Sequence, residues 1–180
     1  MTDFTDLDVD ALVERARNDP AAFAQLYRRY LTPVYRYLYR RLGNEPDAQD
    51  ITSQVFVEAL DGLVRGRYHQ GGCFPAWLFT IARNRLTDLY RRRPVLPLDE
   101  HYSSDPGLTA AVEKGEDRER LERLLARLDE ERRELLRLRF SGGLSFAEIA
   151  RLEGRSEAAV KMSVYRAIEW LREHWEGDNG

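Results

Sequence analysis

The side chains best suited to contact another molecule lie in one short stretch near the C-terminus. Between residues 156 and 166, small, basic and aromatic residues recur on the faces of one predicted helix: Ser156, Ala158, Lys161, Met162, Tyr165 and Arg166. Such side chains can reach base edges or phosphates when a helix enters the major groove of a duplex. The stretch therefore predicts contact with nucleic acid.

The surrounding residues predict a helix, a tight turn and a second helix over residues 144–173. Ser145 followed by Glu148 forms a capping box, in which each residue satisfies a backbone donor of the other. Gly154 can leave the first helix in the left-handed conformation, and Ser156 can cap the second. The apolar stripe of the second helix falls away from the candidate contacts and comprises Val160, Val164, Ala167, Ile168 and Leu171. This pattern indicates a helix-turn-helix, with an ordinary antiparallel helix pair as the alternative.

A second stretch, residues 74–93, mixes arginines with aromatic residues on a predicted helix. A glycine-containing basic loop, residues 65–75, precedes it. Aromatic rings stack on unpaired bases and arginines follow the backbone of a single strand. The residues available to solvent or phosphate are Arg83, Asn84, Arg85, Arg91, Arg92 and Arg93, and the interleaved aromatic residues are Phe74, Trp77, Phe79 and Tyr90. The alternative is structural, with the aromatic rings in a core and the arginines favoured at a helix C-terminus.

Acidic residues open another predicted helix, which begins at Glu45-Pro46-Asp47. Its inner side is predicted to carry Ala48, Ile51, Val55 and Ala59. Asp47, Asp50 and Gln54 fall on other faces. Acids in the first turn favour the helix dipole, which is the simpler explanation; the alternative is a polar contact surface for a partner.

The composition argues against several classes of protein. The chain has 180 residues and one cysteine, Cys73, so it cannot form an internal disulfide or a thiolate metal cluster. Its three histidines are far apart and lack ligand spacing. No apolar run approaches the length of a membrane span or an export signal. We therefore expect a cytoplasmic protein with no metal, no cofactor and no membrane insertion.

The net charge of −3 is unevenly distributed along the chain. Residues 21–93 carry twelve arginines against six acids, whereas residues 1–20 and 94–119 are acidic and residues 120–180 are balanced. Residues 94–119 also contain prolines and paired serines with little periodicity, which is typical of a linker. The pattern predicts an all-α protein with two small helical domains joined by a flexible acidic linker, the second domain containing the helix-turn-helix.

Three segments together resemble a known family over most of residues 20–175. They are EPDAQDITSQVFVEAL, FPAWLFTIARNRLTDLYRRR and LSFAEIARLEGRSEAAVKMSVYRAIEWLRE. In this order and separation they resemble the compact bacterial RNA polymerase sigma factors of the extracytoplasmic-function (ECF) group of the sigma-70 family. The resemblance implies an acidic lead over residues 1–20, sigma domain 2 over 21–93, a linker over 94–119 and sigma domain 4 over 120–176.

The resemblance also implies a role for each candidate residue. The family's core-polymerase contacts match Asp47, Asp50, Gln54 and Phe56. Its contacts to the minus-ten promoter element match Arg67, Phe74, Trp77, Arg83, Asn84 and Arg91. Its contacts to the minus-thirty-five element match Ser156, Ala158, Lys161, Met162, Tyr165 and Arg166. The chain departs from the family pattern at Ser163, where many relatives carry a basic residue, and at Gln49, where an acid is common.

The function so implied is that of a specificity subunit with no catalysis of its own. Such a protein binds core RNA polymerase, recognises both promoter elements and captures the melted strand, and an anti-sigma factor is a further expected partner. Two alternatives remain at this point. One is a dimeric helix-turn-helix regulator of duplex DNA, and the other is a helical adaptor that binds only proteins.

Overall fold

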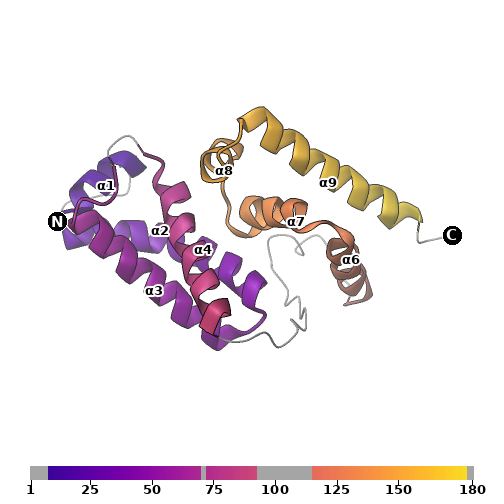
Figure 1. Cartoon of the computed structure of the whole chain (residues 1–180), viewed down its shortest axis with the longest axis horizontal. Coiled ribbons are helices and arrows are strands. Elements are labelled where there is room, and N and C mark those ends of the chain that lie inside the picture. Colours follow the sequence, from indigo (N-terminus) through magenta and orange to yellow (C-terminus); the bar gives the residue numbers. More distant parts are fainter. Residues whose placement is uncertain (1–7, 70–71, 93–114, 178–180) are drawn as a thin grey trace. The chain divides into compact units, whose positions relative to one another are not determined.

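The computed structural model describes residues 8–69, 72–92 and 115–177. The chain divides into two compact units, unit 1 over residues 1–99 and unit 2 over residues 100–180. Every regular element within the described residues is helical (Figure 1). This confirms the predicted all-α fold with two small helical domains. Most of the predicted linker, residues 94–114, lies outside the described residues.

Unit 1 consists, where it is described, of α1 (Val9–Ala16), α2 (Pro20–Leu42), α3 (Glu45–Val64) and α4 (Phe74–Arg92). Helices α2 and α3 each begin at a polar cap. Asp19 caps α2 by accepting a hydrogen bond from the Ala21 amide at 2.8 Å, and Asn44 caps α3 by accepting from the Asp47 amide at 2.9 Å. Between them Gly43, with φ of 69°, ends α2 in the left-handed conformation.

The N-terminal segment differs from the prediction. Residues 1–20 were expected to be a lead to the first domain, but helix α1 begins at Val9 and packs on α2. Its buried residues, Leu12, Val13 and Ala16, lie on one helical face, which is why this short acidic helix joins the core. Residues 1–7 lie outside the described residues.

Helix α2 runs unbroken through Pro33. A proline removes one backbone donor from a helix, and packing on both sides can offset that loss. Leu26 precedes the proline and Val34, Tyr37 and Leu38 follow it, and all four are fully buried. The core therefore holds both halves of α2 in one helix.

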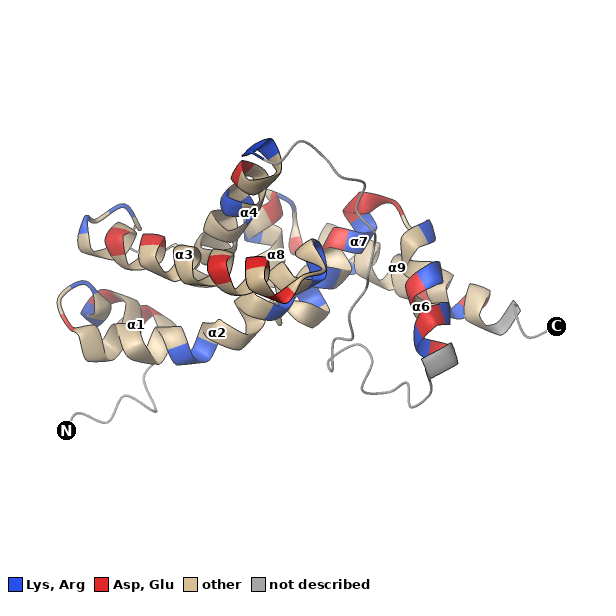
Figure 2. Ribbon diagram, turned by 90° about the horizontal axis from the view of Figure 1, so that it is seen from below, with Lys and Arg blue, Asp and Glu red and all other residues tan. Residues whose placement is uncertain are grey.

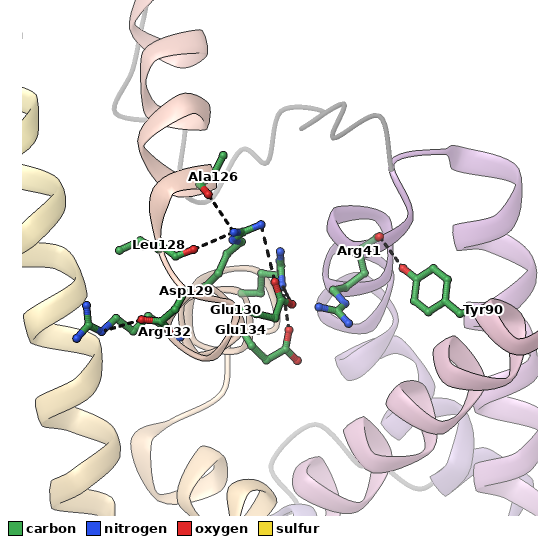
Figure 3. Close-up of polar contacts among 10 residues, drawn as sticks. Arg41, Tyr90, Ala126, Leu128, Asp129, Glu130, Arg132 and Glu134 are labelled. Atoms are coloured by element: carbon green, nitrogen blue, oxygen red, sulfur yellow. Dashed lines mark hydrogen bonds and ion pairs between the residues drawn. The ribbon is translucent and has the colours of Figure 1, made fainter. Parts of the chain in front are cut away.

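An aromatic cluster joins α2 and α4 to the loop between α3 and α4. The Phe74 ring lies at its centre, 5.5 Å from the Tyr30 ring and 5.9 Å from the rings of Tyr68 and Trp77. Trp77 also packs against Gly62 of α3, where an added Cβ would lie 2.7 Å from the indole ring. At the other end of α4, the Tyr90 hydroxyl donates to the Arg41 carbonyl at 2.9 Å (Figure 3). Helix α4 is thus fixed at both ends.

Unit 2 consists, where it is described, of α6 (Gly115–Arg127), α7 (Glu130–Leu136), the π-helical turn η1 (Arg137–Ser141), α8 (Phe146–Glu153) and α9 (Glu157–Gly177). Helix α9 packs against α6, α7 and α8. The guanidinium of Arg133 donates to the carbonyls of Ala126 and Leu128 at 3.1 and 2.8 Å, and Asp129 caps α7 (Figure 3). These contacts fix the short connection between α6 and α7.

The start of α6 differs from the predicted domain boundary. The linker was expected to extend to residue 119, whereas α6 already begins at Gly115. An ion pair one helical turn apart, between Arg118 and Glu122 at 3.3 Å, supports the first part of this helix. The acidic composition of residues 115–119 predicted a linker, but these residues belong to α6, a helix that carries both acidic and basic residues (Figure 2). None of the described helices combines the length and apolar character needed to cross a membrane.

The close approach of α3 and α4 at Gly62 gives a stability prediction. Replacing Gly62 by alanine forces the Trp77 ring to move, because the new Cβ would lie 2.7 Å from it. We expect a loss of about 1–3 kcal/mol in the free energy of unfolding, measured by urea denaturation. The control is Ser53→Ala on the exposed side of α3. A Gly62→Ala variant as stable as this control would contradict the packing described.

Candidate nucleic-acid interfaces

The first half of α9 presents a free face made of the residues predicted to contact duplex DNA. All six are exposed: Ser156, Ala158, Lys161, Met162, Tyr165 and Arg166. Met162 and Tyr165 expose 53% and 51% of their surface. Large apolar side chains exposed together often mark a site of contact with another molecule. On the opposite side Val160, Val164 and Ala167 are buried as predicted, whereas Ile168, which was predicted for the same stripe, is 37% exposed.

The turn before α9 has the predicted geometry. The Ser145 hydroxyl accepts from the Glu148 amide at 3.2 Å, and the Ser145 amide donates to the Glu148 carboxylate at 2.6 Å. Gly154 ends α8 with φ of 64°. Ser156 then accepts from the Ala159 amide at 3.3 Å and so caps α9. The capping box, the glycine and the second cap together set where α9 starts.

Aromatic and cationic contacts hold Tyr165 at the surface. Its ring packs against the Phe146 ring of α8 in an edge arrangement, with the two centroids 5.9 Å apart. The Arg139 guanidinium in turn lies 4.8 Å from the centroid of the Phe146 ring. The Lys161 ammonium lies 5.7 Å from the Tyr165 ring on α9 itself. The exposed ring is therefore supported on two sides.

Sequence reasoning missed Arg155, which lies in the turn between α8 and α9. Its guanidinium donates to Glu131 of α7 at 2.5 Å and to the Ser163 hydroxyl of α9 at 3.0 Å. In the sequence, an arginine in a turn is expected to be a solvated charge. No local spacing in the sequence links residue 155 to residue 131.

In unit 1 the predicted minus-ten contacts are divided between surface and core. Arg67, Asn84 and Arg91 are exposed, and Trp77 and Arg83 are half-buried. Arg67 forms an ion pair with Asp61 of α3. Residues 70–71 of the same loop lie outside the described residues, as does Arg93.

Phe74, one of the predicted minus-ten contacts, is buried in unit 1. Phe74 exposes only 1% of its surface, because it fills the centre of the aromatic cluster. Its ring supports Trp77 and Tyr68 rather than facing a nucleic acid. The sequence predicted an aromatic residue at the end of the loop but could not tell which ring faces inward.

A surface pocket of about 370 Å³ brings two of the predicted contacts together. Its lining comprises Glu58, Asn84, Arg85, Thr87, Asp88 and Arg91. Arg85 is held there by Glu58 of α3, with its Nε 2.7 Å from the carboxylate. Glu58, Thr87 and Asp88 were missed, although the last two lie one helical turn from Asn84 and Arg91 and share their face.

The outward side of α3 carries the predicted polar contacts. Gln54 donates to Asp50 at 2.8 Å, and Asp47 accepts from the Asn44 amide group at 3.0 Å. Gln49, which departs from the family pattern, donates to Glu45 at 2.8 Å. Figure 2 shows acidic positions spaced along α3 and basic positions at the C-terminal end of α4.

Phe56, one of the predicted core-polymerase contacts, is buried in unit 1. Phe56 is 4% exposed and its ring packs at 4.8 Å against Tyr27 of α2. The exposed apolar residues of α3 are Val57, Leu60 and Val64, at 70%, 38% and 60% exposure. Their spacing of three and seven residues, on the face opposite Val55 and Ala59, is the signal that sequence reasoning overlooked.

Comparison with known proteins follows the division into two units. Residues 26–94 match Sigma-70 region 2, and residues 118–171 match Sigma-70, region 4. ECF RNA polymerase sigma factor BldN of Streptomyces coelicolor is 39% identical over 172 residues, which cover 89% of this chain and 63% of BldN. The chain thus spans less than two thirds of that relative.

Two further relatives match over nearly their full length. ECF RNA polymerase sigma factor RpoE of Cereibacter sphaeroides is 33% identical, with 97% of this chain and 99% of RpoE covered. The solved structure of CnrH in complex with the cytosolic domain of CnrY superposes with a TM-score of 0.63 at 27% identity, covering 94% of this chain and 97% of CnrH. These matches favour the sigma-factor interpretation over a dimeric regulator or an adaptor. With both sigma regions in order and a relative matched end to end, the chain belongs to the ECF group of the sigma-70 family of RNA polymerase sigma factors.

Proposed function

We propose that this protein binds core RNA polymerase and selects promoters through two separate DNA contacts. Residues 120–176 would bind the minus-thirty-five element, residues 21–93 would bind the polymerase and the minus-ten element, and residues 94–119 would join them. The observation that carries the proposal is the first half of α9, where six candidate contact residues are exposed over a buried apolar stripe.

The exposed face of α9 has the chemistry needed to read a major groove. Lys161 and Arg166 can bind phosphates or the acceptor atoms of guanine, and Met162 and Tyr165 can contact thymine methyl groups. The Ser156 end of the helix adds the positive pole of the helix dipole toward phosphate. Contacts of both kinds from one rigid helix would fix the register of the protein on the duplex.

Unit 1 has the chemistry needed to hold a separated strand. Opening duplex costs about 1.4 kcal/mol per base-pair step, while stacking a base on an aromatic ring returns about 1–3 kcal/mol. The half-buried Trp77 ring lies 5.1 Å from the ring of Tyr68 in the loop, and Phe74 keeps it in place. The pocket lined by Asn84, Arg85 and Arg91 offers hydrogen-bonding groups and cations for a base and its phosphate.

The polymerase-binding surface would be the outward side of α3. It combines acids and an amide, Asp47, Asp50 and Gln54, with the exposed apolar residues Val57, Leu60 and Val64. A surface of this mixed kind resembles the apolar centre and polar rim of protein interfaces. Gln49 keeps a polar group at its edge through its contact with Glu45.

We further propose that the protein acts in the cytoplasm, performs no catalysis of its own and is held inactive by an anti-sigma factor. Support for a second protein partner comes from CnrH, which was solved with the cytosolic domain of CnrY. The exposed apolar residues of α3 would be covered by whichever partner is bound.

Replacing Trp77 and Asn84 together by alanine should abolish open complexes while leaving polymerase association intact. The reason is that both side chains, on α4, are proposed to serve the separated strand, whereas the proposed polymerase contacts are on α3. Open complexes on a matched promoter are measured by permanganate reactivity of unpaired thymines, and association by gel filtration. A promoter with a pre-melted bubble should partly restore transcription. If it restores nothing, or if the variant melts duplex normally, the roles are wrong.

Replacing Val57 by glutamate should weaken binding to core polymerase by about tenfold or more, because a charge would enter an apolar contact worth about 1.5–3 kcal/mol. Val57 is 70% exposed, so the thermal stability of the free protein should not change. The matched control is Thr80→Glu, an exposed position on α4. Competition between labelled wild type and each variant for core polymerase measures the effect. Equal competition by both variants would remove α3 from the interface.

A further inference from the structure

Ser163 lies on α9 beside a cation that another part of unit 2 supplies. Its hydroxyl, half-buried, accepts from the Nη2 of Arg155 at 3.0 Å. The guanidinium comes from the turn that precedes α9 rather than from the helix itself. The serine is therefore the acceptor of a hydrogen bond within unit 2.

The same arginine links three helices. Its Nη1 donates to the Glu131 carboxylate of α7 at 2.5 Å, and its backbone amide donates to the Ala150 carbonyl at 3.0 Å and so closes α8. With the contact to Ser163, one residue joins α7, α8 and α9. A guanidinium is a flat, rigid fork, so acceptors on two helices restrict how those helices turn relative to each other.

This link contributes little to stability. The Arg155 side chain is 31% exposed and that of Glu131 is 67% exposed, and ion pairs open to solvent are weak and screened by salt. Buried apolar residues such as Leu135, Ile149 and Val164 hold the unit together instead. The contacts of Arg155 with Glu131 and Ser163 therefore affect the orientation of α9 more than the stability of unit 2.

The orientation of α9 matters because its contact residues lie at increasing distances from the turn. Arg166 is about 14 Å along the helix axis from Glu157 at the start of α9, at about 1.5 Å per residue. A small rotation at the turn would displace its guanidinium by about the margin within which a hydrogen bond is made or lost. Base contacts far from the turn are the most sensitive to this rotation.

We propose that Arg155 is a positioning residue that fixes the recognition face of α9 through Glu131 and Ser163. It sets how well the protein discriminates between matched and mismatched upstream promoter elements. The inference rests on the proposed function, in which α9 enters the duplex. It differs from a phosphate contact, in which the guanidinium would leave Glu131 for the DNA.

The test uses the full chain bound to core polymerase and promoter fragments with matched or mismatched minus-thirty-five elements. Arg155→Ala should reduce the ratio of the two affinities about tenfold, as expected for loss of one well-aligned base contact. The dependence of log affinity on log salt should keep its slope. Lys161→Ala is the control for a phosphate contact and should lower that slope by about 1.

Glu131→Ala should reduce discrimination as much as Arg155→Ala, and the double variant should lose no more than either alone. If Arg155 instead bound phosphate, Glu131→Ala would free it and tighten binding to both fragments. The double change Arg155→Ala with Ser163→Arg moves the guanidinium to α9, within reach of Glu131, and should restore discrimination. This restored variant also shows that the loss is not a failure to fold.

Two results would overturn the inference: unchanged discrimination in Arg155→Ala, or no recovery when the arginine is moved to position 163. A wild-type complex that does not distinguish the two fragments would instead contradict the proposed function.

Discussion

Burial of one stripe of α9 is the constraint on which the rest of the structure depends. Val160, Val164 and Ala167 pack into unit 2 with almost no exposed surface. At 3.6 residues per turn this leaves the residues between them, Lys161, Met162 and Tyr165, facing outward. The helix cannot expose a different face without burying a lysine or uncovering the core. Surface chemistry on α9 is thus a consequence of core packing.

In unit 1, the packing of aromatic residues likewise determines which side chains of α4 are exposed. Phe74 fills the centre of a cluster that holds Trp77 half-exposed, and Gly62 lets α4 approach α3 closely enough for the indole to lie between them. The ion pair between Arg85 and Glu58, and the bond from Tyr90 to the Arg41 carbonyl, fix the arginine-rich part of α4. Both units therefore hold candidate contact residues on helices whose own packing leaves them little freedom.

Local signals in the sequence predicted the caps, the turn at Gly154 and the outward face of α9, because each depends on residues within one or two helical turns. The burial of Phe56 and Phe74 could not be predicted, for a physical reason. Whether a ring faces inward depends on partners such as Tyr27 and Tyr30, which are distant in sequence. Helix α1 and the bridge made by Arg155 escaped prediction for the same reason, since their stabilising contacts are with other helices.

The central claim is that two helices, one in each unit, contact promoter DNA in different states. It is tested most directly by photocrosslinking from p-benzoylphenylalanine placed at position 162 or at position 84, in the complete complex of polymerase, protein and promoter. The account predicts crosslinks from position 162 to duplex at the minus-thirty-five element and from position 84 to the separated strand near the minus-ten element. Crosslinks from position 162 to protein alone, or from both positions to the same duplex segment, would contradict it.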